Sequence, residues 1–198
     1  MAKENISKKR SWSTRDLLVT IMLGLAFGVI LIPVTWAYAG LLSLGGIFAR
    51  SIMGGLYFLP AAFAAYVMRK PGATLLASLL SALPPMLFSP YSLIVLIIAA
   101  LIGLVGEICV WIITRYRYFS QARLLWTGLA SGVVVYVLIL GSVLHTTTFT
   151  TSVLLLALLV SAVTFAACSL IAKFLADSVA KTGVLANTAL GETGADEI

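Results

Sequence analysis

Long apolar runs separated by short polar connections dominate the chain. A helix needs about 20 apolar residues to cross a hydrocarbon core of about 30 Å. The pattern predicts an all-α integral membrane protein with six transmembrane helices, at about 17–32 (continuing beyond Pro33 towards Tyr38 if the proline is tolerated), 47–68, 73–88, 91–114, 124–144 and 152–176. The third run is short and contains Pro84 and Pro85, so we expect its outer end to be kinked or unwound.

The positions of the basic residues test this count. If the N-terminus is cytoplasmic, all of the 13 Lys and Arg residues except Arg50 fall on the cytoplasmic side. Basic residues concentrate in cytoplasmic loops, and a miscounted helix would scramble the segregation. We therefore expect both termini in the cytoplasm, with an N-terminal segment at 1–16, a six-helix domain at 17–178 and a mobile tail at 179–198.

Composition sets further limits. The chain is 61% hydrophobic and 10% charged, with a mean hydropathy of +1.10, which excludes a soluble globular class. Cys109 and Cys168 lie within apolar runs, where a thiol serves as a small hydrophobe more often than in a disulfide or a metal site. The net charge of +6 reports orientation more than partners, so nucleic-acid binding is not inferred.

Glu107 is the only acid inside an apolar run. A carboxylate in hydrocarbon costs roughly 2.5 to 3.5 kcal/mol on insertion scales and is a candidate functional group. Trp111 stands one helical turn further on and Gly103 one turn back. A carboxylate beside an indole suits an organic cation. By the span count Glu107 lies towards the cytoplasmic half, so either the pocket is deep or Glu107 is a structural acid bonded to a hydroxyl or backbone of a neighbouring helix.

The outer connections carry the other candidate binding residues. We expect 33–46 to form a semi-apolar loop, with Trp36 and Tyr38, over an outward-facing pocket. Tyr91 ends the next outer turn, and His145 begins the last one. Aromatic residues at these depths also suit the interfacial belt. Arg50 can pair with an anionic group of a ligand, a lipid or the protein, and we favour a structural or interfacial role for it.

Small residues recur at helical spacing in two runs. Thr20, Gly24 and Gly28 form a stripe that lets another helix approach closely, either inside the bundle or on a partner protein. A second set indicates tight packing of the fifth span, and it consists of Gly128, Ser131 and Gly132.

Signatures of catalysis are missing from the sequence. The single histidine excludes a metal centre built from several imidazoles, and Glu107 has no second carboxylate beside it in the membrane. The chain also lacks a glycine-rich phosphate loop that ends in Lys and Ser or Thr. We therefore expect no enzyme and no cofactor. Uphill transport would draw its energy from a partner or an ion gradient, and a small binding subunit fits better than a transporter acting alone.

In the order of its features the chain resembles the substrate-binding S-component of an energy-coupling factor (ECF) vitamin transporter. It is similar to the YkoE-type component associated with thiamine or its hydroxymethylpyrimidine precursor. The resemblance covers about 12–181 and is carried by the opening Trp12-Ser13-Thr14-Arg15-Asp16, the Gly24/Gly28 stripe, the Trp36 loop and the Glu107/Trp111 helix.

The resemblance implies a six-helix S-component fold in a prokaryotic cell membrane, with capture of a vitamin from outside. It also implies a transmembrane T-component and cytoplasmic ATPases as partners in an ABC importer. In many S-components an Ala-xxx-Ala motif on the first helix docks the T-component, and Thr20, Gly24 and Gly28 supply small residues at that spacing here.

Thiamine carries a permanent positive charge and an aminopyrimidine, and both suit Glu107. The resemblance then makes Trp36, Tyr38 or Trp111 candidates for stacking on the rings. Two alternatives remain open. One is an S-component for another vitamin, and the other is a membrane scaffold without a transport role.

Overall fold

The described part of the protein consists of six apolar helices, of which the first two are joined in one continuous element. The computed structural model describes residues 12–89, 92–116, 119–143 and 150–181, without the side chains of 42–45, 92, 140–143 and 181. All of these residues lie in helices or their connections, and the helices are α2 (Thr14–Met68), α3 (Ala73–Phe88), α4 (Ser92–Thr114), α5 (Gln121–Val143) and α6 (Thr151–Lys181). Because α2 contains two spans, every predicted helix is found, and the all-α membrane fold is confirmed.

Among the described residues, five segments are long and apolar enough to cross a membrane: Thr14–Leu41, Gly46–Met68, Leu93–Thr114, Gln121–Ile139 and Thr151–Ala180. The other helix, α3, has 16 residues and is shorter, as its sequence predicted. The first helix begins at Thr14 and the last continues to Lys181, so the helices extend past the predicted domain limits at 17 and 178. Residues 1–11 and 182–198 of the predicted terminal segments lie outside the described residues.

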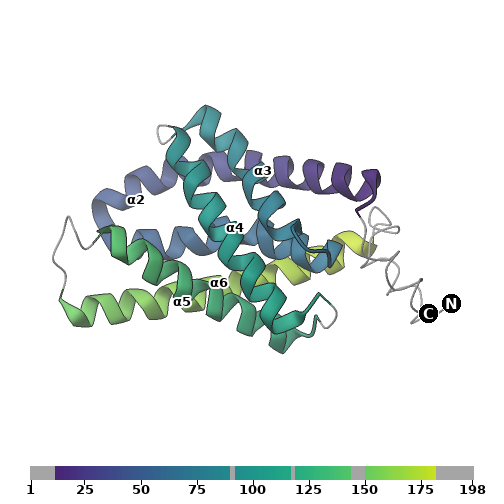
Figure 1. Ribbon diagram of the computed structural model, residues 1–198. Coiled ribbons are helices and arrows are strands. Elements are labelled where there is room, and N and C mark those ends of the chain that lie inside the picture. The colour runs from purple at the N-terminus through teal and green to yellow at the C-terminus, as the bar shows by residue number, and fades with distance from the viewer. Residues whose placement is uncertain (1–11, 90–91, 117–118, 144–149, 182–198) are drawn as a thin grey trace.

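A single glycine reverses the chain inside α2. Gly46 has φ 48° and ψ −111°, a conformation that costs a residue with a side chain far more than glycine. The first segment of α2 (Thr14–Leu41) and the second (Gly46–Met68) therefore run in opposite directions. Figure 1 shows this reversal at the end of the bundle opposite to the start of α2 and the end of α6.

The helix continues through Pro33 to Leu41, so the expected continuation beyond the proline is confirmed and the predicted outer loop at 33–46 is wrong. Proline removes one backbone donor, whereas an irregular segment in hydrocarbon would free many polar groups. In the next turn the Thr35 hydroxyl donates to the Leu31 carbonyl at 2.8 Å. Trp36 and Tyr38 consequently lie on a helix and not in a loop.

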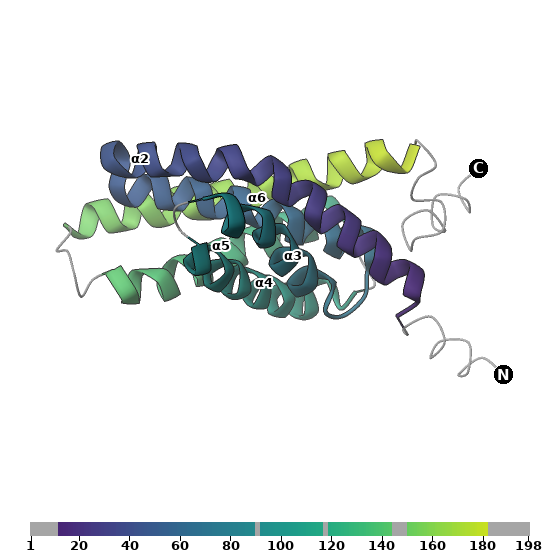
Figure 2. The ribbon, with the colours of Figure 1, turned by 90° about the horizontal axis from the view of Figure 1, so that it is seen from above.

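The second segment of α2 is the central helix of the bundle (Figure 2). Its residues from Ala61 to Met68 are all buried, so it is apolar on every side. The ring of Phe58 stacks on that of Phe165 in α6, with centroids 5.1 Å apart. Gly55 allows α6 to approach closely, since an added Cβ would lie 2.5 Å from Thr164 Cγ2.

The small-residue stripe of the first span packs against α3. Thr20 is fully buried, and a Cβ added at Gly24 would lie 2.7 Å from Leu80 Cβ. A Cβ added at Gly28 would lie 2.7 Å from Pro84 Cδ and 2.8 Å from the Ser81 carbonyl oxygen. Helix α3 thus covers the stripe, which fits the alternative of packing inside the bundle, and docking of a T-component through these residues stays a prediction.

The predicted tight packing of the fifth span is confirmed. A Cβ added at Gly128 would lie 2.7 Å from Ala166 Cα, and one at Gly132 would lie 2.9 Å from the Ser161 carbonyl oxygen. Ser161 donates its hydroxyl to the Gly132 carbonyl at 3.1 Å across the same contact. Helices α5 and α6 thus meet backbone to backbone.

The outer end of α3 stays helical to Phe88, so the predicted unwinding at Pro84 and Pro85 is wrong. Two contacts support this end. Pro84 packs on Gly28 of α2, and Trp36 donates its indole N–H to the Phe88 carbonyl at 2.9 Å. The neighbouring helix thus holds the last turn of α3.

Glu107 caps the N-terminus of α3. Its Oε1 accepts the Gly72 N–H at 2.6 Å, and its Oε2 accepts the N–H groups of Thr74 and Leu75 at 3.0 and 3.3 Å. The Tyr116 hydroxyl also donates to Oε1. An anion at a helix N-terminus satisfies free backbone donors and complements the helix dipole. Of the two roles expected for Glu107, ligand binding and structural support, these contacts support the structural one.

Close packing of α4 on α3 brings the carboxylate to this position. A Cβ added at Gly103 would lie 2.9 Å from Ser78 Cβ and 3.1 Å from Leu75 Cα. Ser78 donates its hydroxyl to the Ala99 carbonyl at 2.6 Å in the same contact. Because Gly103 precedes Glu107 by one helical turn, the acid is held directly over the start of α3.

The other two described acids are also paired at this end of the bundle. Lys70 contacts Asp16 at 2.5 Å, and Lys173 contacts Asp177 at 3.1 Å. Tyr66 donates its hydroxyl to Asp177 at 2.9 Å. We call this the basic end, formed by the start of α2, the α2–α3 and α4–α5 connections and the end of α6. The opposite end, with the Gly46 reversal, is the far end.

The packing of Gly28 gives a first prediction. Gly28→Ala should lower the melting temperature in detergent, because overpacking a close helix contact costs about 1 to 3 kcal/mol. Gly40→Ala is the matched control, since nothing lies within 4 Å of a Cβ at that exposed helical position. The control should leave the melting temperature unchanged or raise it. Equal melting temperatures for Gly28→Ala and the wild type would contradict the packing.

The cap gives a second prediction. Glu107→Gln should lower the free energy of unfolding by about 2 kcal/mol, because hydrogen bonds to a charged acceptor are stronger than neutral ones. Tyr116→Phe removes one donor and leaves the three backbone bonds, so its effect should be smaller. Chemical denaturation in micelles measures both. A Glu107→Gln variant as stable as the wild type would refute the capping role.

Candidate functional site

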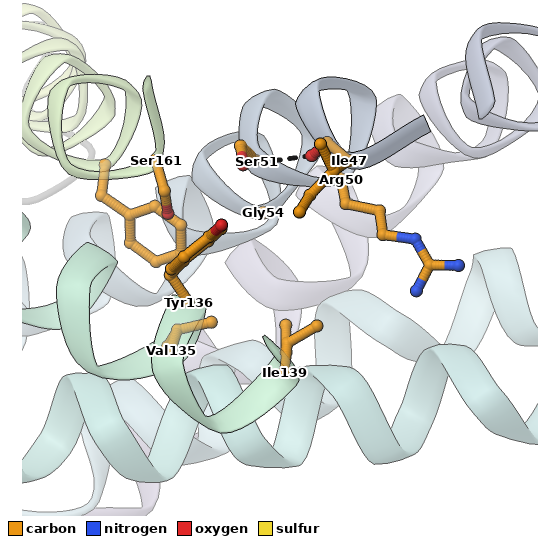
Figure 3. Close-up of a pocket in the computed structure, with 9 residues that line it drawn as sticks. Ile47, Arg50, Ser51, Gly54, Val135, Tyr136, Ile139 and Ser161 are labelled. Carbon is orange, nitrogen blue, oxygen red and sulfur yellow. Dashed lines mark hydrogen bonds between the residues drawn. The ribbon is translucent and has the colours of Figure 1, made fainter. Parts of the chain in front are cut away.

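A pocket opens near the far end between the second segment of α2, α5 and α6. It holds about 370 Å³ of space, including its open mouth, and is lined by Ile47, Arg50, Ser51, Gly54, Val135, Tyr136, Ile139, Ser161 and Phe165. Figure 3 shows these side chains converging from the three helices. Two features of α2 shape its wall: a lone cation at Arg50 and a gap at Gly54, which has no side chain to fill the space.

The hydroxyl groups of the pocket donate their hydrogen bonds to backbone carbonyls. Tyr136 donates to the Leu154 carbonyl at 2.9 Å, and Ser161 donates to that of Gly132 at 3.1 Å. Ser51 lies within 3.2 Å of the Ile47 carbonyl and 3.0 Å of the Ala157 carbonyl. With their protons engaged, the three oxygens retain acceptor capacity. The pocket therefore suits a ligand that presents N–H or O–H donors.

The same hydrogen bonds fix the shape of the pocket. Each of the three hydroxyls joins its own helix to a carbonyl of another helix, so Tyr136 and Ser161 tie α5 to α6 and Ser51 ties α2 to α6. Phe165 forms the deep wall and is almost fully buried through its stacking on Phe58. These contacts hold the lining side chains in place.

Among the described lining residues, Arg50 carries the only formal charge. Its side chain is exposed and extends away from Tyr136 and Ser161 (Figure 3). Within the described part of the chain, the ion pairs join Lys70 to Asp16 and Lys173 to Asp177, and Arg50 takes part in none. The hydroxyl oxygens, and not the guanidinium, are therefore the polar groups that face one another in the pocket.

The residues predicted from sequence to bind the substrate lie elsewhere. Glu107 is bonded to the start of α3 at the basic end, and Trp111 is 61% exposed on the surface of α4. Trp36 is 55% exposed and bonded to the end of α3, and Tyr38 lies on the same helix. Tyr91 and His145 lie outside the described residues. None of the four described residues lines the pocket, and direct ligand contact by any of the six stays a prediction.

Sequence reasoning missed the pocket, although a signal for it was present. Ile47, Arg50, Ser51 and Gly54 follow the spacing i, i+3, i+4, i+7, so one helix face gathers a cation, a hydroxyl and a gap. Arg50 stands out in the sequence as the exceptional outer cation, whereas Ser51 and Gly54 on the same face do not stand out alone. Tyr136 and Ser161 carry no such signal, because isolated polar residues are common in spans.

Clusters of metal ligands are not found among the described residues, in which no group of three or more His, Cys, Asp or Glu side chains comes together. Cys109 and Cys168 are both buried and unlinked, as expected for small hydrophobes.

Comparison with known proteins identifies the family. Residues 15–134 match the model of the family described as "ABC-type cobalt transport system, permease component". The chain is also 29% identical over 185 residues to "Putative HMP/thiamine permease protein YkoE" of Bacillus subtilis (strain 168), where the alignment covers 92% of each chain.

A solved structure is similar along almost the whole chain. It is described as "Crystal structure of an S-component of ECF transporter", and it matches with a TM-score of 0.85 and 27% sequence identity, covering 94% of this chain and 95% of the other. The S-component fold expected from the sequence is confirmed. The chain therefore belongs to the family of ABC-type cobalt transport system permease components, and it is a multi-pass membrane transport protein of the ECF S-component type.

Proposed function

We propose that the chain is the substrate-binding S-component of an ECF-type ABC importer for thiamine or hydroxymethylpyrimidine. It captures its substrate from outside in the pocket between α2, α5 and α6. The observation that carries the proposal is this far-end pocket, lined by acceptor hydroxyls, in a chain that matches an S-component over 94% of its length. The two candidate substrates, hydroxymethylpyrimidine and thiamine, come from the name of the YkoE relative.

The pocket suits the aminopyrimidine ring that both substrates share. The exocyclic amino group of that ring donates two hydrogen bonds, and the oxygens of Tyr136, Ser51 and Ser161 can accept them. The Tyr136 and Phe165 rings supply apolar walls for a flat heteroaromatic ring.

Glu107 acts in this proposal as a structural acid and not as the counter-ion of the substrate. Its two oxygens already accept the Gly72, Thr74 and Leu75 N–H groups. The family description names cobalt, but the described residues bring together no group of three or more metal-ligating side chains. An organic substrate is therefore the proposal. Tyr91 and His145 belong to the predicted outer connections and stay candidates for the mouth of the site.

Energy for uptake comes, in this proposal, from a transmembrane T-component and cytoplasmic ATPases. The sequence contains no glycine-rich phosphate loop of its own, and the likeness to an ECF S-component favours partner subunits. The chain itself then acts as a binding subunit without a cofactor and without catalysis.

Ligand-dependent stability tests the proposed substrate. Purified protein should melt at a higher temperature with hydroxymethylpyrimidine or thiamine, because a ligand at 100 times its Kd adds about 2.7 kcal/mol of stability. Riboflavin and biotin serve as controls and should have no effect, since neither carries the aminopyrimidine ring that the pocket hydroxyls are proposed to bind. Stabilisation by neither pyrimidine compound, or equal stabilisation by the controls, would reject the proposed substrate.

A single hydroxyl tests the location of the site. Tyr136→Phe should weaken hydroxymethylpyrimidine binding about 2- to 10-fold in calorimetry, the effect of one neutral hydrogen bond. Tyr57→Phe is the matched control, because the Tyr57 hydroxyl bonds to Thr35 and does not line the pocket. Both variants must first show near-native melting. Equal affinities for the two variants would place the site elsewhere.

A further inference from the structure

The wall of the pocket has a gap at Gly54, in the second segment of α2. Gly54 lines the pocket together with the ring of Phe165 from α6. A Cβ added at Gly54 would lie 3.1 Å from Cε2 of Phe165 and 3.5 Å from its Cζ. Carbon atoms that are not bonded prefer separations of about 3.5 to 4.0 Å, so a single added carbon already fills the space between the two residues.

The ring of Phe165 has no room to retreat from this gap. It is 1% exposed and stacks on the ring of Phe58, with centroids 5.1 Å apart. Phe58 is itself 1% exposed, and α4 holds it from the other side, because a Cβ added at Gly106 would lie 2.8 Å from Phe58 Cε2. Interiors packed this closely transmit strain and do not absorb it. An atom added at Gly54 therefore takes space from the pocket and not from the core.

The shape of the aminopyrimidine decides which of its groups would lie near Gly54. Hydroxymethylpyrimidine and thiamine share a ring methyl group, and they differ in the substituent at the opposite side of the ring. If both bind in the same way, the differing substituent points to the open mouth, where groups of different size fit. The methyl group then points inwards, to the apolar wall that Gly54 and Phe165 form.

We propose that Gly54 is a specificity-determining residue that recognises the ring methyl group of the substrate. The methyl group packs on the backbone of Gly54 and on the edge of the Phe165 ring. The inference rests on the proposed function and deepens it, because it defines the substrate class as an aminopyrimidine that carries this methyl group. A ligand without the methyl leaves the gap empty, and a side chain at position 54 closes it.

Calorimetric titration of the full chain with two pyrimidines tests this proposal. One is hydroxymethylpyrimidine and the other is its analogue without the ring methyl group. The wild type should bind the methylated compound about 4-fold more tightly, the effect of one buried methyl group. Gly54→Ala should weaken binding of the methylated compound roughly 10-fold or more through overpacking, and binding of the analogue much less, so the preference should vanish or reverse.

Gly40→Ala is the matched control, because it makes the same substitution at an exposed helical position where nothing lies within 4 Å of the added Cβ. It should preserve the wild-type preference. Equal affinity of the wild type for the two pyrimidines, or an unchanged preference in Gly54→Ala, would overturn the inference and leave the proposed function standing. The first of these results needs no variant, so it decides the matter even if Gly54→Ala does not fold. Absence of binding of both compounds to the wild type would overturn the proposed function and the inference together.

Discussion

The contact between the Glu107 carboxylate and the N-terminus of α3 is the interaction on which the arrangement of the bundle depends. Helix α3 has 16 residues and begins directly after a tight turn at Gly72, so its first N–H groups need partners close to the membrane. Glu107 accepts three of them from α4. This fixes α3 against α4, and α3 in turn covers the glycine stripe of α2.

The two ends of the protein consequently have different tasks. The basic end holds every described acid in an ion pair or a cap, which stabilises the junctions between helices. The far end has a helix reversal at Gly46 and a pocket whose hydroxyls are oriented by backbone carbonyls, and no acid lies there among the described residues. Because the ion pairs that stabilise the fold lie at the basic end, they do not occupy the pocket. The likeness to an S-component is the basis for the binding role proposed for this pocket.

Sequence reasoning predicted the helices well because hydrocarbon thickness and the cost of exposed backbone leave few alternatives. It left open whether the first helix ends at Pro33, and the predicted loop at 33–46 is wrong because, in a bilayer, continuing the helix costs less than a loop. It also left open the partner of Gly24 and Gly28, because spacing shows that another helix approaches closely but not whether that helix is α3 or belongs to another protein.

The site was harder to predict for a related reason. The cost of burying Glu107 is the same whether it binds a cation or caps a helix, so the sequence left both roles open. Three-dimensional contacts distinguished them, and the pocket residues come from helices more than 80 positions apart, such as Ser51 and Tyr136. Only the face formed by Ile47, Arg50, Ser51 and Gly54 was accessible to a helical-period argument.

The most direct test of the central claim is an experimental structure of the chain with hydroxymethylpyrimidine bound. The account predicts ligand density between Arg50, Tyr136 and Ser161, with Glu107 still bonded to the start of α3. Density beside Glu107 and Trp111, with the α3 cap broken, would contradict it.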